Sequence, residues 1–190
     1  MAILKVAHMG HPVLREKTKP ISPSEIGSPR IQQLIDDMFE TMAEYSGIGL
    51  AAPQVHEGVR LFVAGVRNAK VVTPMTDDEE MPFITVINPE IVPVGEETEG
   101  GWEGCLSIPD IRGKVVRPAS VRLRALDRKG RRIELVASGL PARVIQHEAD
   151  HLDGVLFFDR MASFETLTFM DEFGRYWKEH SSEDDEDDEE

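Results

Sequence analysis

Two histidines four residues apart give the strongest chemical signal in the chain. Residues 147–151 read HEADH, so His147 and His151 are one helical turn apart and Glu148 lies beside them. On a helix, side chains at positions i and i+4 share a face, and two imidazoles there can bind one metal ion. Glu148 would then project next to the ion and could handle a proton. The pattern predicts a metal-dependent hydrolytic centre, and the alternative is an amphipathic helix with two unrelated histidines.

The third metal ligand is less obvious from spacing. No acidic residue or histidine downstream of the motif stands out, whereas the single cysteine of the chain, Cys105, lies upstream in the segment GWEGCLSIP. A thiolate binds borderline divalent ions strongly, and two His with one Cys and a water make an open tetrahedral site. Taken alone, Cys105 could equally be a small buried apolar residue, which is how most free cysteines behave.

A third segment, GIGLAAPQ at residues 47–54, combines small residues with a terminal amide. Small residues allow a backbone to approach a ligand closely, and Gln54 offers an N–H to a developing oxyanion. Taken alone, the segment is more typical of a helix end followed by a tight turn. Its glycine spacing matches neither phosphate-binding loop type.

Hydrophobic periodicity predicts the elements that must position these residues. We expect helices over 30–45, 140–152 and 163–179, strands over 59–66 and 83–87, a β-hairpin over 121–137, and an exposed loop over 68–82. The apolar residues of the last helix are expected to reach the core. The predicted fold is α+β, with mainly antiparallel β-sheets around a central metal-binding helix and flanking N- and C-terminal helices.

Length and charge limit the organisation of the chain. Its 190 residues fit one domain, predicted over 1–180, followed by an acidic tail at 181–190 that is too charged to fold. Eight of the 35 acidic residues lie in this tail, which leaves 27 against 21 Lys and Arg. This balance disfavours a nucleic-acid partner. We expect no disulfide, no membrane span and no secretory signal, and therefore a cytoplasmic protein.

Taken together, GIGLAAPQ, EGCLS and QHEADH resemble, in this order and spacing, the three signature motifs of the peptide deformylase family. The resemblance extends from HPVLR near the N-terminus to GVLFFDR after the metal motif. It implies a metal-dependent hydrolase that removes the N-formyl group from the N-terminal formylmethionine of newly made polypeptides and releases formate. Formylmethionyl nascent peptides would be its substrates.

The resemblance also implies a role for each matching residue. The metal ligands would be Cys105, His147 and His151, with a metal-bound water or hydroxide as the nucleophile. Glu148 would act as general base and then general acid. Gln54 and the backbone N–H of Leu106 would stabilise the oxyanion. The substrate would lie against Gly47, Ile48, Gly49, Leu140 and Val144.

Three further expectations concern the surroundings of the metal. Glu103 and Arg117 stand where the family has a buried ionic pair that braces the cysteine loop, although Arg117 could be a surface residue. Arg143 stands where the family often has an apolar residue, and its side chain could alter the rim of the substrate pocket or point to solvent, which we expect. Ligand softness alone favours zinc. The resemblance implies one Fe(II) per chain as the native ion, with Zn, Ni or Co as substitutes.

Two other functions fit parts of the sequence. A zinc endopeptidase shares the HExxH motif, but such enzymes normally lack a Cys ligand. A non-catalytic binding protein of the same fold is disfavoured because it has no need for Glu148. The acidic tail is best explained as a solvated extension. Its alternative is an interaction arm that contacts a basic partner such as a ribosomal surface transiently.

Overall fold

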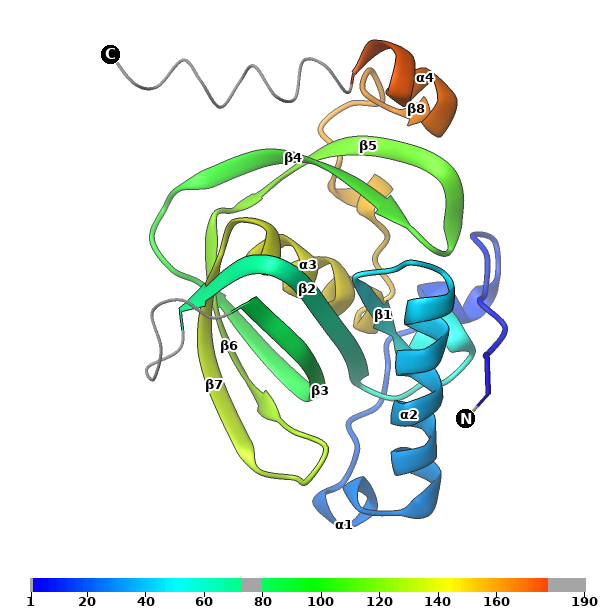
Figure 1. Cartoon of the computed structure of the whole chain (residues 1–190), viewed down its shortest axis with the longest axis vertical. Coiled ribbons are helices and arrows are strands. Elements are labelled where there is room, and N and C mark those ends of the chain that lie inside the picture. Colours follow the sequence, from blue (N-terminus) through cyan, green and yellow to red (C-terminus); the bar gives the residue numbers. More distant parts are fainter. Residues whose placement is uncertain (1, 73–79, 178–190) are drawn as a thin grey trace.

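The computed structural model describes residues 2–72 and 80–177. It contains two antiparallel sheets and a helix between them (Figure 1). The five-stranded sheet has the order β1 (Gly49–Ala51), β2 (Leu61–Val72), β3 (Glu80–Pro93), β6 (Ser120–Leu126) and β7 (Arg132–Ser138). The three-stranded sheet has the order β4 (Thr98–Cys105), β5 (Ile108–Pro118) and β8 (Thr168–Phe169). The far end of β2 also pairs with β7, so four strands of the larger sheet close on themselves.

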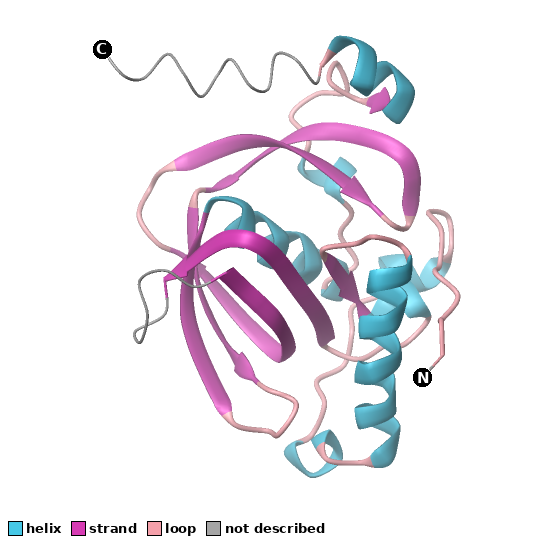
Figure 2. Cartoon of the chain, in the orientation of Figure 1, coloured by secondary structure: helices cyan, strands magenta, loops and turns pink. Residues whose placement is uncertain are grey.

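Four α-helices and three short 3₁₀ helices complete the described fold (Figure 2). The α-helices are α1 (Pro23–Ile26), α2 (Pro29–Glu44), α3 (Gly139–Leu152) and α4 (Met170–Tyr176). The 3₁₀ helices are η1 (Pro12–Arg15), η2 (Ala52–Val55) and η3 (Phe157–Arg160). None of the helices in the described ranges is long and apolar enough to cross a membrane. The predicted α+β fold class is confirmed.

Helix α3 lies at the centre of the molecule, between the two sheets (Figure 1). One of its faces places Ala142, Ile145 and Leu152 in the core of the five-stranded sheet. The helix ends where Gly154 adopts a φ of 73°, and a Cβ there would lie 2.7 Å from the backbone of Arg15. Glycine is therefore required after the helix, both for the left-handed conformation and for the close approach of the N-terminal segment.

Helix α2 covers the other side of β1 and β2, as the periodicity of residues 30–45 predicts. Its N-cap is Ser28, whose side chain accepts a hydrogen bond from the backbone N–H of Ile31. The buried apolar face consists of Ile31, Leu34, Ile35, Met38 and Met42. This face packs against Leu50 and Leu61, so the helix anchors the strand that leads into the GIGLAAPQ segment.

Strands β4 and β5 form a hairpin that the sequence did not predict. Strand β4 reads TEGGWEGC, and its glycines have low strand propensity. The register places Glu103 opposite Gly113 and then shifts, so that Cys105 lies opposite Ile108. Leu106 and Ser107 make the turn. This irregularity ends the strand at the cysteine.

Two predicted elements were wrong in part. The expected loop at 68–82 includes the end of β2 and the start of β3, and only residues 73–79 lie outside the described part. Within the described part of the expected helix at 163–179, which ends at residue 177, only the seven residues of α4 are helical, because turns and the short strand β8 precede them. Phe164 and Phe169, expected in the core, are 67% and 61% exposed.

The strands predicted over 59–66 and 83–87 are confirmed as parts of the longer strands β2 and β3. The remaining predicted elements are confirmed to within a few residues. The range 140–152 is α3, and 121–137 is the β6–β7 hairpin, paired from Ser120↔Ser138 to Leu126↔Arg132. The acidic tail at 181–190 lies outside the described residues, and the single-domain organisation of 1–180 stays a prediction.

Candidate active site

The three predicted metal ligands meet in one cluster. Cys105 comes from the end of β4, and His147 and His151 come from the face of α3 that points to the three-stranded sheet. The ligand atoms of all three residues lie within 4.8 Å of one another. The distance from Cys105 Sγ to His151 Nε2 is 3.2 Å. The i, i+4 spacing on the helix thus places both imidazoles beside the cysteine, as the sequence predicts.

The chemistry of this donor set fits a divalent transition metal ion. Burial raises the pKa of the Cys105 thiol, but the neighbouring imidazoles of His151 and His147 outweigh burial and hold that pKa well below its usual range. A thiolate is the form of cysteine that binds a metal. Two imidazoles and one thiolate leave a fourth tetrahedral position open, which is the arrangement of catalytic rather than structural sites.

Glu103 fixes the orientation of one of the histidines. Its Oε2 lies 2.9 Å from His147 Nδ1. The carboxylate can only accept hydrogen bonds, so Nδ1 carries a proton and Nε2 is the ring nitrogen that would bind a metal ion. A carboxylate behind a metal-binding histidine is the usual way to select the tautomer and fix the ring.

Glu103 is itself held by two buried arginines. Arg117 donates to both carboxylate oxygens, at 2.6 and 2.9 Å, and Arg143 donates to Oε1 at 2.9 Å. Burial opposes the charge, but the hydrogen bonds from Arg117 and His147 outweigh it and lower the pKa of Glu103 to about 2. Arg117 also donates to Asp150 on α3 at 2.9 Å, so the predicted Glu103–Arg117 pair is confirmed and continues into the metal helix.

The expectation that Arg143 points to solvent was wrong. The residue is only 8% exposed, and its guanidinium reaches Glu103 and backbone carbonyls of the three-stranded sheet. A position on the buried face of a helix gives an arginine no route to water. Its charge therefore needs partners inside the protein.

Glu148 lies at the same cluster in an environment that favours its neutral form. The carboxyl is buried, and no described residue bonds its Oε2. Burial raises its pKa to about 7, close to the value that suits a group exchanging protons at neutral pH. A Cβ on Gly49 would lie 2.2 Å from Glu148 Oε1. The glycine therefore makes room for this carboxylate.

Gln54 is held in one orientation. Its Oε1 accepts a hydrogen bond from the backbone N–H of Ala51 at 2.8 Å. The amide nitrogen is consequently directed at Cys105 Sγ, at 3.4 Å, and at Ser107 Oγ, at 3.3 Å. A rigid N–H donor beside the metal cluster is the geometry expected of an oxyanion-stabilising group.

A cavity of about 480 Å³ opens over the cluster. All the residues predicted to bind substrate line it: Gly47, Ile48, Gly49, Leu140 and Val144. Gln54, Leu106 and Glu148 line it as well. Val144 is buried, whereas Ile48 and Leu140 are about half exposed. The cavity therefore has apolar side chains both at its inner wall and at its rim, among polar ones, as ligand pockets usually do.

Several lining residues were missed from the sequence. Trp102, Arg112 and Met170 lie at the cavity, and Ser107 is fully buried against Gln54. Met170 is 58 residues from Arg112, whose Nε lies 3.0 Å from the methionine sulfur. No local pattern could show this proximity. Ser107 could have been predicted to lie near the metal cluster, because it is only two residues after Cys105.

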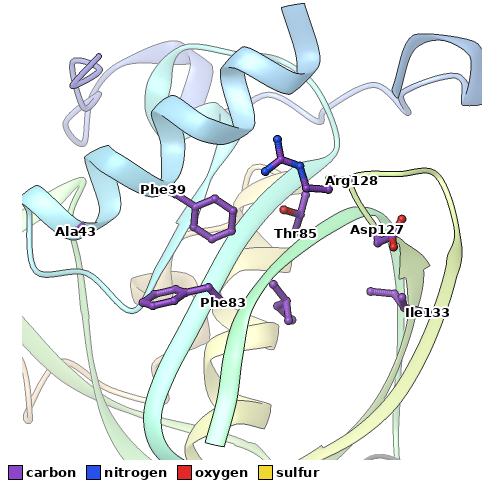
Figure 3. A pocket seen from close by; sticks show the side chains of 8 residues that line it. Phe39, Ala43, Phe83, Thr85, Asp127, Arg128 and Ile133 are labelled. Atoms are coloured by element: carbon purple, nitrogen blue, oxygen red, sulfur yellow. The ribbon is translucent and has the colours of Figure 1, made fainter. Parts of the chain in front are cut away.

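A second cavity, of about 520 Å³, lies away from the cluster (Figure 3). It is formed by α2, β3 and the β6–β7 hairpin, and its walls include Phe39, Phe83 and Ile133. Its two charged residues already have partners: Asp127 pairs with Arg131, and Arg128 pairs with Asp36. No cysteine or histidine is among the described residues that line this cavity.

Comparisons with known proteins agree with this geometry. A family model described as polypeptide deformylase matches residues 3–166. The chain is 46% identical over 169 residues to a peptide deformylase of Salinibacter ruber, covering 85% of this chain and 82% of that protein. A peptide deformylase structure from Thermotoga maritima matches with a TM-score of 0.75 at 37% identity, covering 86% of this chain and all of that one.

A third match is a class I type b peptide deformylase from Acinetobacter baumannii, solved with Met-Ala-Ser bound. It is 39% identical, with a TM-score of 0.75, and covers 84% of this chain and 99% of that one. The fold and the Cys-His-His cluster define a metal-dependent hydrolase. The chain belongs to the peptide deformylase family. It is an enzyme that removes the N-formyl group from newly made polypeptides.

Proposed function

We propose that Cys105, His147 and His151 bind the catalytic ion and that Glu148, Gln54 and Leu106 carry out the reaction around it. The observation that carries this proposal is the convergence of the three ligand atoms, within 4.8 Å, on one side of a cavity that Glu148 and Gln54 also line. When bound, the ion supplies Lewis acidity, which lets water attack at neutral pH and polarises the formyl carbonyl.

Glu148 is the proton carrier in this scheme. It accepts a proton from the attacking water as the new bond to the formyl carbon forms. It then gives that proton to the amine nitrogen as the C–N bond breaks, which leaves formate and a free N-terminal methionine. A pKa near 7 supports both directions of transfer.

Gln54 and Leu106 stabilise the negative charge on the formyl oxygen. The amide nitrogen of Gln54 is already oriented by Ala51, so it needs no reorganisation during the reaction. Leu106 follows Cys105 in the β4–β5 turn, where its backbone N–H is the proposed second donor. Such donors are worth roughly 2.7–4 kcal/mol each in other enzymes.

The methionine side chain is proposed to lie along Val144, with Ile48 and Leu140 at the rim and Gly47 and Gly49 beside the peptide. The related A. baumannii structure supports this substrate class, since it holds Met-Ala-Ser, a peptide with methionine first. We further infer that Fe(II) is the native ion and that Zn, Ni or Co can replace it. A donor set of one thiolate and two imidazoles suits all four.

The decisive test is formate release from a formyl-Met peptide by protein prepared without oxygen and loaded with ferrous iron, nickel or zinc. We expect release in each case, fastest with ferrous iron, and a loss of at least about 100-fold in Glu148→Ala with the metal still bound. Full activity in Glu148→Ala, or in Cys105→Ala, would refute the proposed roles. Faster release with zinc than with iron would refute only the metal assignment.

Two finer proposals concern the place of action. We propose that the enzyme works in the cytoplasm, where new polypeptides carry their formyl group, and that it contacts the ribosome only transiently. The support is the substrate class and the run of eight acids at 183–190, which could bind a basic ribosomal protein. Deletion of residues 181–190 should weaken cosedimentation with ribosomes and leave peptide deformylation unchanged. Unchanged cosedimentation would remove the tail from this proposal.

A further inference from the structure

Arg143 is a buried cation that none of the proposed catalytic roles uses. It is 8% exposed and lies on α3 exactly one i, i+4 step before His147, on the same helix face. Burying a guanidinium is costly unless its donors find acceptors in good geometry. A residue kept at this cost beside a metal site calls for a functional explanation.

The guanidinium of Arg143 joins α3 to both long strands of the three-stranded sheet. One nitrogen donates to Glu99 O on β4 at 2.8 Å. The other donates to Val115 O on β5 at 2.8 Å and to Glu103 Oε1 at 2.9 Å, with Gly101 O further away at 3.4 Å. These contacts fix the position of β4, the strand that ends at Cys105, relative to α3, the helix that carries His147 and His151.

Gly101 provides the space for this arrangement. A Cβ on Gly101 would lie 2.7 Å from Cζ, Nε and Nη2 of the Arg143 guanidinium. The two residues are therefore matched, since only glycine at 101 lets the arginine pass over β4 to Glu103. By contrast, a Cβ on Gly100 would meet nothing within 4 Å.

The link to the metal site runs through Glu103. Its Oε2 contacts His147 Nδ1, and its Oε1 is shared by Arg117 and Arg143. Arg117 extends from β5 and is also bonded to Asp150, whereas Arg143 extends from α3 and is also bonded to the backbone of β4. Two arginines from different directions leave the carboxylate little freedom to rotate away from the imidazole.

We propose that Arg143 is a positioning residue for the metal site, which sets the geometry of His147 through Glu103 and that of Cys105 through β4. The inference rests on the ligand set proposed above. It explains why a chain with Arg117 already paired to Glu103 keeps a second buried arginine. The residue acts through Glu103 and the strand, and it takes no part in proton transfer.

The test uses cobalt(II), whose visible absorption reports the coordination geometry. Affinity is measured by competition with a chelator for the wild type, Arg143→Met and Arg143→Lys. Arg124→Met is the matched control, because Arg124 lies on an exposed part of β6 and pairs with Glu134 on β7. We expect Arg143→Met to bind cobalt 10- to 100-fold more weakly with an altered spectrum, as for other partners that orient a metal ligand. Lys should restore part of the loss, because one ammonium can reach Glu103 but cannot bond both strands.

Gly101→Ala displaces the guanidinium without removing it. We expect it to weaken cobalt binding in the wild-type background and to have little further effect in Arg143→Met, because the two changes disrupt the same contact. This variant and Arg143→Lys carry the test if Arg143→Met does not fold. Folding of each variant is checked by circular dichroism and thermal unfolding.

The outcomes separate the possible explanations. Folded Arg143→Met and Gly101→Ala proteins with wild-type cobalt affinity and spectrum would overturn the proposal, and Arg143 would then only hold the sheet to the helix. The ligand set is tested separately with His151→Ala. If that variant still binds one cobalt per chain with the wild-type spectrum, the proposed ligand set fails independently of Arg143.

Discussion

At the scale of single residues, the site depends on side chains that are held by neighbours before any substrate arrives. Gln54 is oriented by a backbone N–H, Glu103 by two arginines, and Glu148 fits against a glycine. Preorganised groups of this kind need not rearrange during the reaction. Small changes in the supporting residues should therefore be felt mainly in the chemical step.

Gly49→Ala should reduce kcat strongly with little loss of stability of the fold. The added methyl would lie 2.2 Å from Glu148 Oε1, so the carboxylate must move. If Glu148 is the proton carrier, as proposed, its displacement loses much of the 10²- to 10⁴-fold contribution of general acid–base catalysis, and we expect a drop in kcat of about 100-fold. Steady-state kinetics measure it, with Gly100→Ala as the control, and wild-type kcat in Gly49→Ala would show that Glu148 tolerates displacement.

Gln54→Leu should lower kcat by about 10²- to 10³-fold and leave KM nearly unchanged, because the proposed role of the lost donor is to stabilise charge that develops in the transition state. The matched control is Gln33→Leu on α2, whose amide bonds Asp37 far from the cavity. A large rise in KM at constant kcat would instead show that Gln54 binds the ground state.

The sequence predicted the residues of the site better than their surroundings. Cys105, His147 and His151 were found because a motif fixes the residue types and their spacing. The direction of Arg143 was not found, because it depends on Gly101, a residue 42 positions away that leaves space on another element. A glycine in the sequence does not indicate which distant side chain occupies the space that its missing side chain leaves.

At the scale of elements, the sequence patterns missed the β4–β5 hairpin and overestimated the last helix, of which only α4 forms. Strand β4 owes its stability to the long pairing with β5 rather than to the propensities of its glycines. Helix α4 has no buried residue and is held by aromatic contacts with Trp102 on β4. The ring centroid of Trp102 lies 4.9 Å from that of Phe173 in the helix and 5.3 Å from that of Trp177, which directly follows it. Periodicity overestimated the length of this helix because the apolar residues before Met170 lie in turns and in β8.

Phe173→Ala should loosen α4 and raise KM a few-fold for a formylated tripeptide, with kcat unchanged. The reason is that α4 carries Met170 to the wall of the cavity, away from the metal cluster. The loss of one aromatic pair is worth about 0.5–1.5 kcal/mol beyond buried area, so the thermal midpoint should fall by only a few degrees.

The control for this change is Phe164→Ala, since Phe164 is 67% exposed and does not line the cavity. Equal KM values for the two variants and the wild type would mean that α4 does not contact the peptide.

At the scale of the whole molecule, the N-terminal segment and η3 are joined by an ion pair between Arg15 and Asp159. Burial raises the pKa of Asp159, but the hydrogen bonds from Arg15 and from the backbone N–H of Leu156 outweigh it and lower that pKa overall. The ionised carboxylate therefore stabilises the folded state above the unfolded pKa of about 3.9, and this stabilisation is lost as the pH falls through the lower folded value.

Asp159→Asn should lower the free energy of unfolding by up to about 1 kcal/mol at pH 7, because the pair is largely exposed and water screens it. The difference from the wild type should shrink below pH 4, since the wild-type carboxyl is then losing its charge. Urea unfolding at pH 7, 5 and 3 measures both the loss of unfolding free energy at neutral pH and its decrease in acid. A difference that stays constant with pH would assign the effect to the backbone contact with Leu156 instead of the charge.

The proposed ligands come from segments that are far apart in the chain, since His151 follows Cys105 by 46 positions. An ion bound to both would act as a removable cross-link between the hairpin and the helix, and ligands that bind only the folded state stabilise it by mass action. Enzyme abundance should then follow the metal supply, since empty molecules would open and be degraded sooner than loaded ones. A cell short of the metal would hold less of the protein, rather than a reserve of inactive enzyme awaiting its ion.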